Sequence, residues 1–120
     1  MSKRNIKLVA RAIADALPLA GQQYGVTTHI QSPARRARNL IENGYVREPT
    51  SFCDGALVQI GMEPRNYDDP DDCAVPLNYY EGDGDGADAI SDLLTPELTG
   101  ERYGWYVEFI NAGVAAVYKG

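Results

Sequence analysis

Residues 32–62, SPARRARNLIENGYVREPTSFCDGALVQIGM, decide the fold because the hydrophobic pattern within them changes from helical to extended. Ser32 is typical of an N-cap, Pro33 suits the first helical position, and Gly44 suits the left-handed residue after a helix. The apolar residues between these signals recur at helical spacing and share one face: Ala37, Leu40 and Ile41. We therefore predict a helix over residues 32–43. Its charged side chains, Arg35, Arg36, Arg38 and Glu42, are expected to lie mostly on the outer face.

The second part of this stretch has the pattern of strands. Short apolar runs flank Asp54-Gly55, a dipeptide typical of tight hairpin turns. We therefore predict a hairpin within residues 51–62 that turns at Asp54-Gly55. A helix is thus followed directly by antiparallel strands.

The flanking segments extend this pattern in both directions. Residues 5–17 place apolar side chains at helical spacing, and Pro18 ends that helix. Residues 87–94 predict a short helix with Asp85 or Asp88 as its N-cap. Residues 104–110 and 114–118 are rich in aromatic and β-branched side chains, which favours two strands, with a helix over 101–112 as the alternative. We expect an α+β fold: two N-terminal helices followed by a small antiparallel sheet with an additional short helix, in one compact domain over residues 1–120.

Composition excludes several classes of protein. Apolar residues make up 44% and charged residues 23% of the chain, which argues against global disorder. The longest apolar run is far shorter than the roughly 20 residues that span a bilayer. The first residues lack the apolar core of a signal peptide, so we expect a cytoplasmic protein that does not bind membranes. Cys53 and Cys73 are expected to be buried reduced thiols, with one disulfide as the alternative.

The net charge of −6 is divided unevenly along the chain. Residues 1–60 carry eight basic and four acidic side chains, a formal charge of +4, whereas residues 61–120 carry three basic and thirteen acidic ones, a formal charge of −10. Such asymmetry indicates a face made for a charged partner, two halves that attract each other, or an acidic loop region that keeps the protein soluble.

The densest acidic stretch is YYEGDGDGADAISD, residues 79–92. A twelve-residue loop starting at Glu81 resembles the calcium loops of EF-hand and dockerin proteins, with oxygen ligands at Glu81, Asp83 and Asp85, glycine at 86 and Asp92 in the twelfth place. Position 8 of such loops is usually aliphatic, but here it is Asp88. The interpretation that we favour is a solvated acidic surface without a metal.

The residues that enzymes need for catalysis are few. His29 is the only histidine and has no nucleophile motif beside it, and the sequence contains no phosphate-binding loop and no HExxH motif. Carboxylates in a wet glycine-rich loop keep ordinary pKa values and give little acid–base power. We therefore expect a protein that is not an enzyme and holds no cofactor or metal.

Residues 31–60 carry a basic helix that ends in LIENGYV and is followed by the expected hairpin. This pattern resembles the second half of a winged helix. The resemblance implies that the helix enters the major groove of DNA, where Arg35, Arg36 and Arg38 would contact phosphates or bases. Nucleic-acid binding is therefore the alternative function.

The function that we favour is binding to a basic protein surface. Carboxylates steer such a partner, while tyrosines supply contact area at low entropic cost. This composition is typical of small acidic inhibitors, including phage anti-defence proteins, antidotes and nucleic-acid mimics, whose targets are basic or handle nucleic acids. The predicted partner-binding surface consists of Asp68, Asp69, Asp71, Asp72, Tyr79, Tyr80, Glu81, Asp83 and Asp85.

Overall fold

The computed structural model describes residues 2–17, 32–63, 74–75, 77–80, 84–94 and 104–119. In chain order these ranges contain α1 (Ser2–Ala16), α3 (Pro33–Glu42), β1 (Val46–Arg47), the 3-10 turn η1 (Ser51–Cys53), β2 (Val58–Gly61), α4 (Gly84–Leu93), β3 (Tyr106–Asn111) and β4 (Val114–Tyr118). Among the described residues, two helices precede a four-stranded antiparallel sheet, and a third helix lies within the sheet's sequence. The predicted α+β class is therefore confirmed. None of the described helices is long and apolar enough to cross a bilayer.

The strands lie in the order β1-β2-β4-β3, and every neighbouring pair is antiparallel. Because side chains alternate along a strand, the register separates the sheet into two faces. One row of paired residues, Val46, Ile60, Ala115 and Phe109, points into the core together with the row Val58, Val117 and Val107. The opposite face carries Arg47, Gln59, Ala116 and Glu108, with the pair Tyr106 and Tyr118 beside them.

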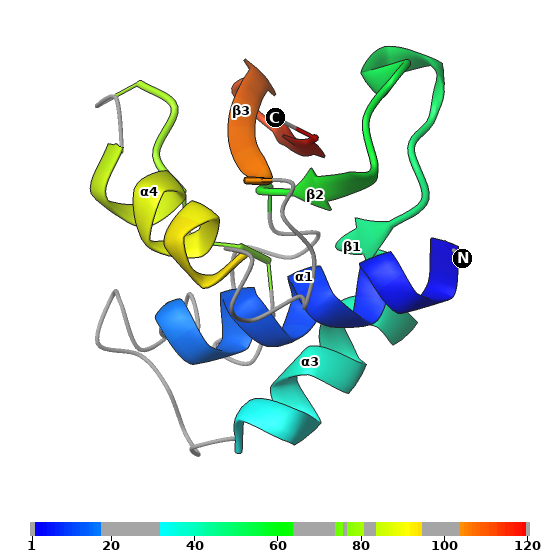
Figure 1. Cartoon of the computed structure of the whole chain (residues 1–120), viewed down its shortest axis with the longest axis vertical. Helices are drawn as coiled ribbons and strands as arrows, with labels where there is room; N and C mark the ends of the chain where they lie inside the picture. The colour runs from blue at the N-terminus through cyan, green and yellow to red at the C-terminus, as the bar shows by residue number, and fades with distance from the viewer. Residues whose placement is uncertain are drawn as a thin grey trace.

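Helix α1 is the central element of the molecule. It contacts α3, α4, β1 and β2, and its side chains Ile6, Val9 and Ile13 are buried in the core. Figure 1 shows α3 beyond α1 on the side away from the sheet, and α4 beside β3. The core therefore lies between α1 and one face of the sheet, α4 closes one side of it, and α3 packs on α1 away from the sheet.

Both ends of α3 follow the predicted signals. The Ser32 side-chain oxygen accepts a hydrogen bond from the Arg35 backbone N–H at 3.2 Å, and Pro33 opens the helix. Gly44 has a φ of 76°, in the left-handed region that glycine adopts without steric cost, and the N–H of Tyr45 donates to the Leu40 carbonyl. These contacts satisfy polar groups that a helix end leaves without intrahelical partners.

The predicted turn at Asp54-Gly55 exists, but it does not join two strands directly. Gly55 has a φ of 86°, and residues 51–53 before it form η1 instead of a strand. The hairpin pairs β1 with β2, which are ten residues apart. Pro49 lacks an N–H for the ladder, and the N–H groups of Cys53 and Ala56 donate within the connection, to Thr50 and Cys53. The connection therefore satisfies part of its own backbone, while Leu57 donates to Val117 of β4.

In the C-terminal half the two predicted strands are confirmed, and the helix begins earlier in the sequence than predicted. Strands β3 and β4 occupy the predicted segments, so the alternative of a helix over 101–112 is wrong for residues 106–111. Helix α4 begins at Gly84, three residues before the predicted start. Asp85 and Asp88 consequently lie inside the helix, and the prediction that one of them is its N-cap is wrong.

Candidate partner-binding surface

Tyr79 and Tyr80 are the described part of the predicted partner-binding surface that is most open to solvent. Tyr80 is 85% exposed and Tyr79 is 43% exposed. Their rings meet edge to face, with centroids 5.4 Å apart, and the Tyr80 N–H donates to the Asn78 side-chain oxygen at 3.1 Å. This local bond holds the turn that presents the two rings.

The two tyrosines are anchored to the folded core. Ala74, Val75 and Leu77, just before them, are buried. The Val75 N–H donates to the Gly61 carbonyl at the end of β2, at 3.2 Å. The Tyr79 ring packs edge to face on Phe109 of β3, with centroids 5.9 Å apart. Tyr79 therefore links the exposed Tyr80 to the edge of the sheet.

Acidic side chains lie on the elements that adjoin this aromatic cluster. Asp88 and Asp92 are exposed on α4, and Glu108 is exposed on β3. Helix α4 packs on β3, where the Ser91 hydroxyl accepts from the Val107 N–H at 3.0 Å and donates to the Ala87 carbonyl at 2.9 Å. The exposed carboxylates of α4 therefore lie on a helix that packs against β3, the strand whose Phe109 contacts Tyr79. We call Tyr79, Tyr80, Phe109, Asp88 and Asp92 the tyrosine–acid surface; Glu108 lies on the opposite face of β3 from Phe109.

The structure brings together only part of the predicted set. Asp68, Asp69, Asp71, Asp72, Glu81 and Asp83 lie outside the described residues, and of Asp85 only the backbone, within α4, is described. The sequence did not reveal Phe109 as a neighbour of Tyr79, because the two residues are thirty positions apart and meet only through the sheet.

The calcium-loop interpretation is wrong for the part of the loop that is described. In such a loop Asp85 and Gly86 would lie in an irregular chain that wraps the ion, with a sharp turn at the glycine. Here both residues lie within α4, whose backbone is held by helical hydrogen bonds. Among the described residues, no group of three or more His, Cys, Asp or Glu side chains is placed to hold a metal ion. His29 lies outside the described ranges.

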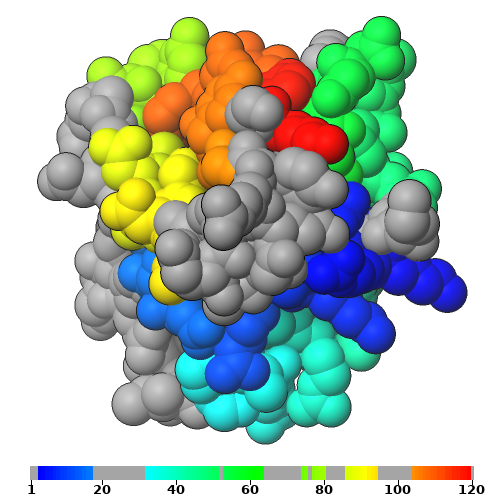
Figure 2. Space-filling model, viewed as in Figure 1, coloured from blue at the N-terminus to red at the C-terminus, as the bar shows by residue number. Residues whose placement is uncertain are grey.

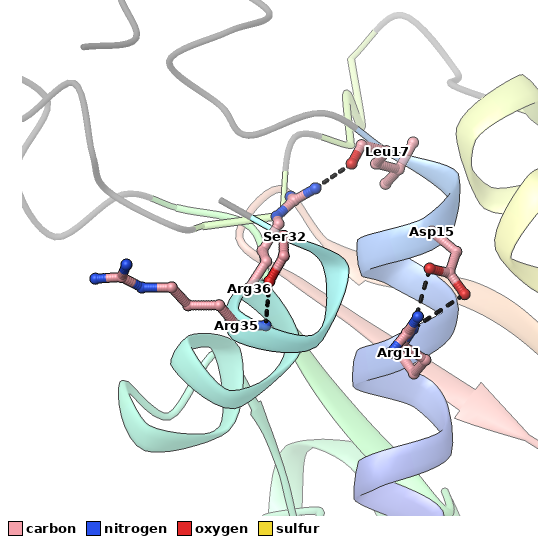
Figure 3. A network of polar contacts seen from close by, with 6 residues as sticks. All are labelled: Arg11, Asp15, Leu17, Ser32, Arg35 and Arg36. Atoms are coloured by element: carbon pink, nitrogen blue, oxygen red, sulfur yellow. Dashed lines mark hydrogen bonds and ion pairs between the residues drawn. The ribbon is translucent and has the colours of Figure 1, made fainter. Parts of the chain in front are cut away.

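The three arginines of the alternative nucleic-acid site are divided between surface and interior. Arg35 and Arg38 are exposed on α3, whereas Arg36 is only 3% exposed. The Arg36 guanidinium donates to the Leu17 carbonyl at the end of α1, while the Arg35 side chain extends away from that helix (Figure 3). The expectation that Arg36 lies on the outer face is therefore wrong. Residue 36 lies one turn before the buried Leu40, on the face that packs against α1.

The outer face of the sheet carries a second aromatic pair. Tyr106 and Tyr118 stack with ring centroids 5.9 Å apart. Burial raises the pKa of Tyr118 above its ordinary value, and the neighbouring Cys53, Glu108 and Tyr106 raise it further. Thr50 donates from its N–H and its hydroxyl to the Gln59 side-chain oxygen, at 2.9 and 2.8 Å, which ties the connection between β1 and β2 to this face.

Cys53 lies in that connection and is fully buried with a free thiol, and burial raises its pKa. A thiol of this kind stays protonated and reacts slowly. The structure records Cys53 as a free thiol, while Cys73, its partner in the alternative disulfide, lies outside the described residues.

Comparisons with protein-family models, with curated proteins and with solved structures found no significant match to this chain.

Proposed function

We propose that this chain is a non-enzymatic protein-binding module that inhibits a basic or nucleic-acid-handling protein. The observation that carries the proposal is the exposed Tyr79–Tyr80 pair, anchored through Phe109 to a rigid sheet. Tyrosine side chains on a rigid support give a large contact area with little loss of side-chain entropy, which is typical of binding hot spots.

The carboxylates of the tyrosine–acid surface support the same proposal. Asp88 and Asp92 are exposed, so they are hydrated before binding and act mainly by steering a basic partner toward the rings. Long-range steering of this kind weakens with added salt, because charges separated by more than about 8 Å are screened at physiological ionic strength. The rings then determine how slowly the complex dissociates, since most affinity differences arise in the dissociation rate.

The winged-helix alternative has weaker support. Helix α3 is followed by the antiparallel strands β1 and β2, as the resemblance implies, but the sheet continues through β4 and β3. Arg36, one of the three arginines assigned to DNA contact, is buried against the end of α1. We therefore place the proposal on the tyrosine–acid surface.

Affinity capture from the source cells, followed by mass spectrometry, tests the proposal. We expect the wild-type chain to retain a basic protein that Tyr79→Ala with Tyr80→Ala loses at least about tenfold, since truncating a hot-spot tyrosine costs roughly 1–4 kcal/mol of binding. The chain should also compete with nucleic acid for the captured protein.

Tyr106→Ala is the matched control. Tyr106 is also a partly exposed tyrosine, 42% exposed, but it lies on the opposite face of β3 from Phe109. Its truncation should leave capture unchanged. Equal retention of the partner by the Tyr79/Tyr80 variant, or equal loss in the Tyr106 variant, contradicts the proposal.

A further inference from the structure

The basic and acidic parts of the sequence also lie in different parts of the folded molecule. In the described residues, α1 and α3 together carry seven basic side chains against Asp15 and Glu42, a formal charge of +5. The described residues outside these two helices carry Arg47 and Lys119 against seven acidic side chains, a formal charge of −5. Atoms of α1 and α3 (blue and cyan) adjoin over the lower part of the face in Figure 2, below those of α4 and β3 (yellow and orange).

The exposed cations of α1 form a regular row. Lys3, Lys7 and Arg11 are exposed and follow one another at intervals of four residues, so they lie on one side of the helix. Four residues of helix rise about 6 Å, so the row spans about 12 Å. Arg11 also pairs with Asp15 at 3.1 Å, and its side chain remains 54% exposed (Figure 3). Within this row, Lys3 and Lys7 therefore attract an anion more strongly than Arg11, whose charge is partly neutralised by Asp15.

Helix α3 enlarges this basic surface. It packs directly on α1, and Arg35 and Arg38 are exposed on it. Arg36 contributes no contact group because its side chain is buried. We call Lys3, Lys7, Arg11, Arg35 and Arg38 the two-helix basic surface. It differs from the predicted arginine site because it includes the α1 row and excludes Arg36.

The carboxylates of α4 do not cancel this surface. In Figure 1, α4 lies on the opposite side of the view from the N-terminal end of α1, and α3 lies at the end of the molecule away from β3. Across that view the molecule extends 27 Å, about three times the screening length of about 8 Å at physiological ionic strength. The carboxylates of α4 are thus largely screened at the N-terminal half of α1, although the whole chain carries −6.

We propose that the two-helix basic surface binds the phosphate backbone of duplex nucleic acid without reading its sequence. A row of cations at regular intervals along a rigid helix complements a polymer whose charges are themselves regular and closely spaced. The carboxylates of a folded acidic protein have no such repeat. The proposal goes beyond the protein-binding function and uses different residues, so the chain can hold a protein at one end and a nucleic acid at the other.

Fluorescence anisotropy with a labelled 20-base-pair duplex of mixed sequence tests this inference. The wild-type chain should bind at 50 mM salt and lose affinity by about 100-fold at 200 mM, which corresponds to about four phosphate contacts. Lys3→Glu with Lys7→Glu should lower the affinity at 50 mM by at least about tenfold, and Lys3→Gln with Lys7→Gln by a smaller factor. All four changes fall at exposed helix positions, and circular dichroism verifies that the variants fold.

The matched control reverses two cations elsewhere. Arg47→Glu with Lys119→Glu makes the same change in net charge on exposed residues outside α1 and α3, and it should reduce binding far less. Tyr79→Ala with Tyr80→Ala should leave duplex binding unchanged, which separates this inference from the proposed function.

Three results overturn the inference: no binding of duplex at 50 mM salt, an equal loss in the Arg47/Lys119 control, or displacement of the duplex by an equal charge of polyglutamate. Sedimentation velocity without nucleic acid gives a fourth test. Self-association at low salt that the Lys3/Lys7 reversal abolishes would assign the surface to a second copy of the chain instead.

Discussion

Arg36 belongs to a basic run in the sequence, but its side chain is buried and contacts the end of another helix. Its guanidinium donates to the carbonyl of Leu17, the residue directly after α1, where carbonyl groups have no partner within the helix. A cation at a helix C-terminus also interacts favourably with the helix dipole. The residue therefore joins the N-terminal part of α3 to the end of α1.

Replacing Arg36 by methionine is expected to destabilise the protein. Methionine retains most of the apolar stem but leaves the Leu17 carbonyl without its donor, and hydrogen bonds that involve a charged group contribute about 1.5–3 kcal/mol. Urea unfolding should show a loss of this size for Arg36→Met. Arg35→Met, at an exposed position one residue away, should change stability by less than about 0.5 kcal/mol. Equal stability of the two variants would show that the buried guanidinium does not hold the helices together.

Arg36 also marks a limit of the sequence analysis. The interval of four residues between positions 36 and 40 was visible, and it places Arg36 on the face of Leu40. Charge alone suggested an exposed residue, since arginine is seldom buried without a partner. The partner is a backbone carbonyl at the end of another helix, and residue types do not reveal it.

At the scale of elements, α4 protects the edge of the sheet. Strand β3 is an edge strand, and its Val107 N–H points away from β4 to the Ser91 hydroxyl of α4. Exposed strand edges are sites of unwanted pairing, and covering them with a helix is one way in which proteins avoid it. The same contact places α4 beside β3, the strand that carries Phe109.

Replacing Ser91 by alanine is expected to loosen α4 from β3. The Val107 N–H then loses its acceptor, which costs about 1–3 kcal/mol for a buried donor. Hydrogen exchange should become faster by about tenfold or more at Val107 and across residues 84–93, because the loss falls on this local contact. Ser51→Ala, at an exposed position of η1, is the control and should leave exchange in α4 unchanged. Unaltered protection of Val107 in Ser91→Ala contradicts the assigned role of the hydroxyl.

At the scale of the whole molecule, α1 is the helix against which both the other described helices and the sheet pack. It contacts α3, α4, β1 and β2, and Ile13 is fully buried among them. The single tryptophan, Trp105, is buried in the same core cluster beside the start of β3. Trp105 fluorescence and helical circular dichroism therefore report on different parts of one core.

Ile13→Ala is expected to lower the free energy of unfolding by about 2–5 kcal/mol, the range for removing a large aliphatic side chain from a packed core. If residues 1–120 form one domain, the fluorescence and circular dichroism transitions should shift together to lower urea. Lys7→Ala, at an exposed position of α1, should shift neither by more than about 0.5 kcal/mol. Separate transitions for the two signals would contradict the prediction of a single domain.

The sequence by itself determined the elements whose signals are local. The helix face of Leu40, the caps Ser32 and Gly44, and the two C-terminal strands could all be predicted, because periodicity and capping act over a few residues. Only the tertiary structure decided the order β1-β2-β4-β3, the burial of Arg36, the contact of Tyr79 with Phe109 and the bond from Val107 to Ser91. These features join residues from 16 to 30 or more positions apart, and such pairings depend on how whole elements pack against one another. The same packing converts the uneven charge of the chain into two surfaces, one basic and one acidic with exposed tyrosines.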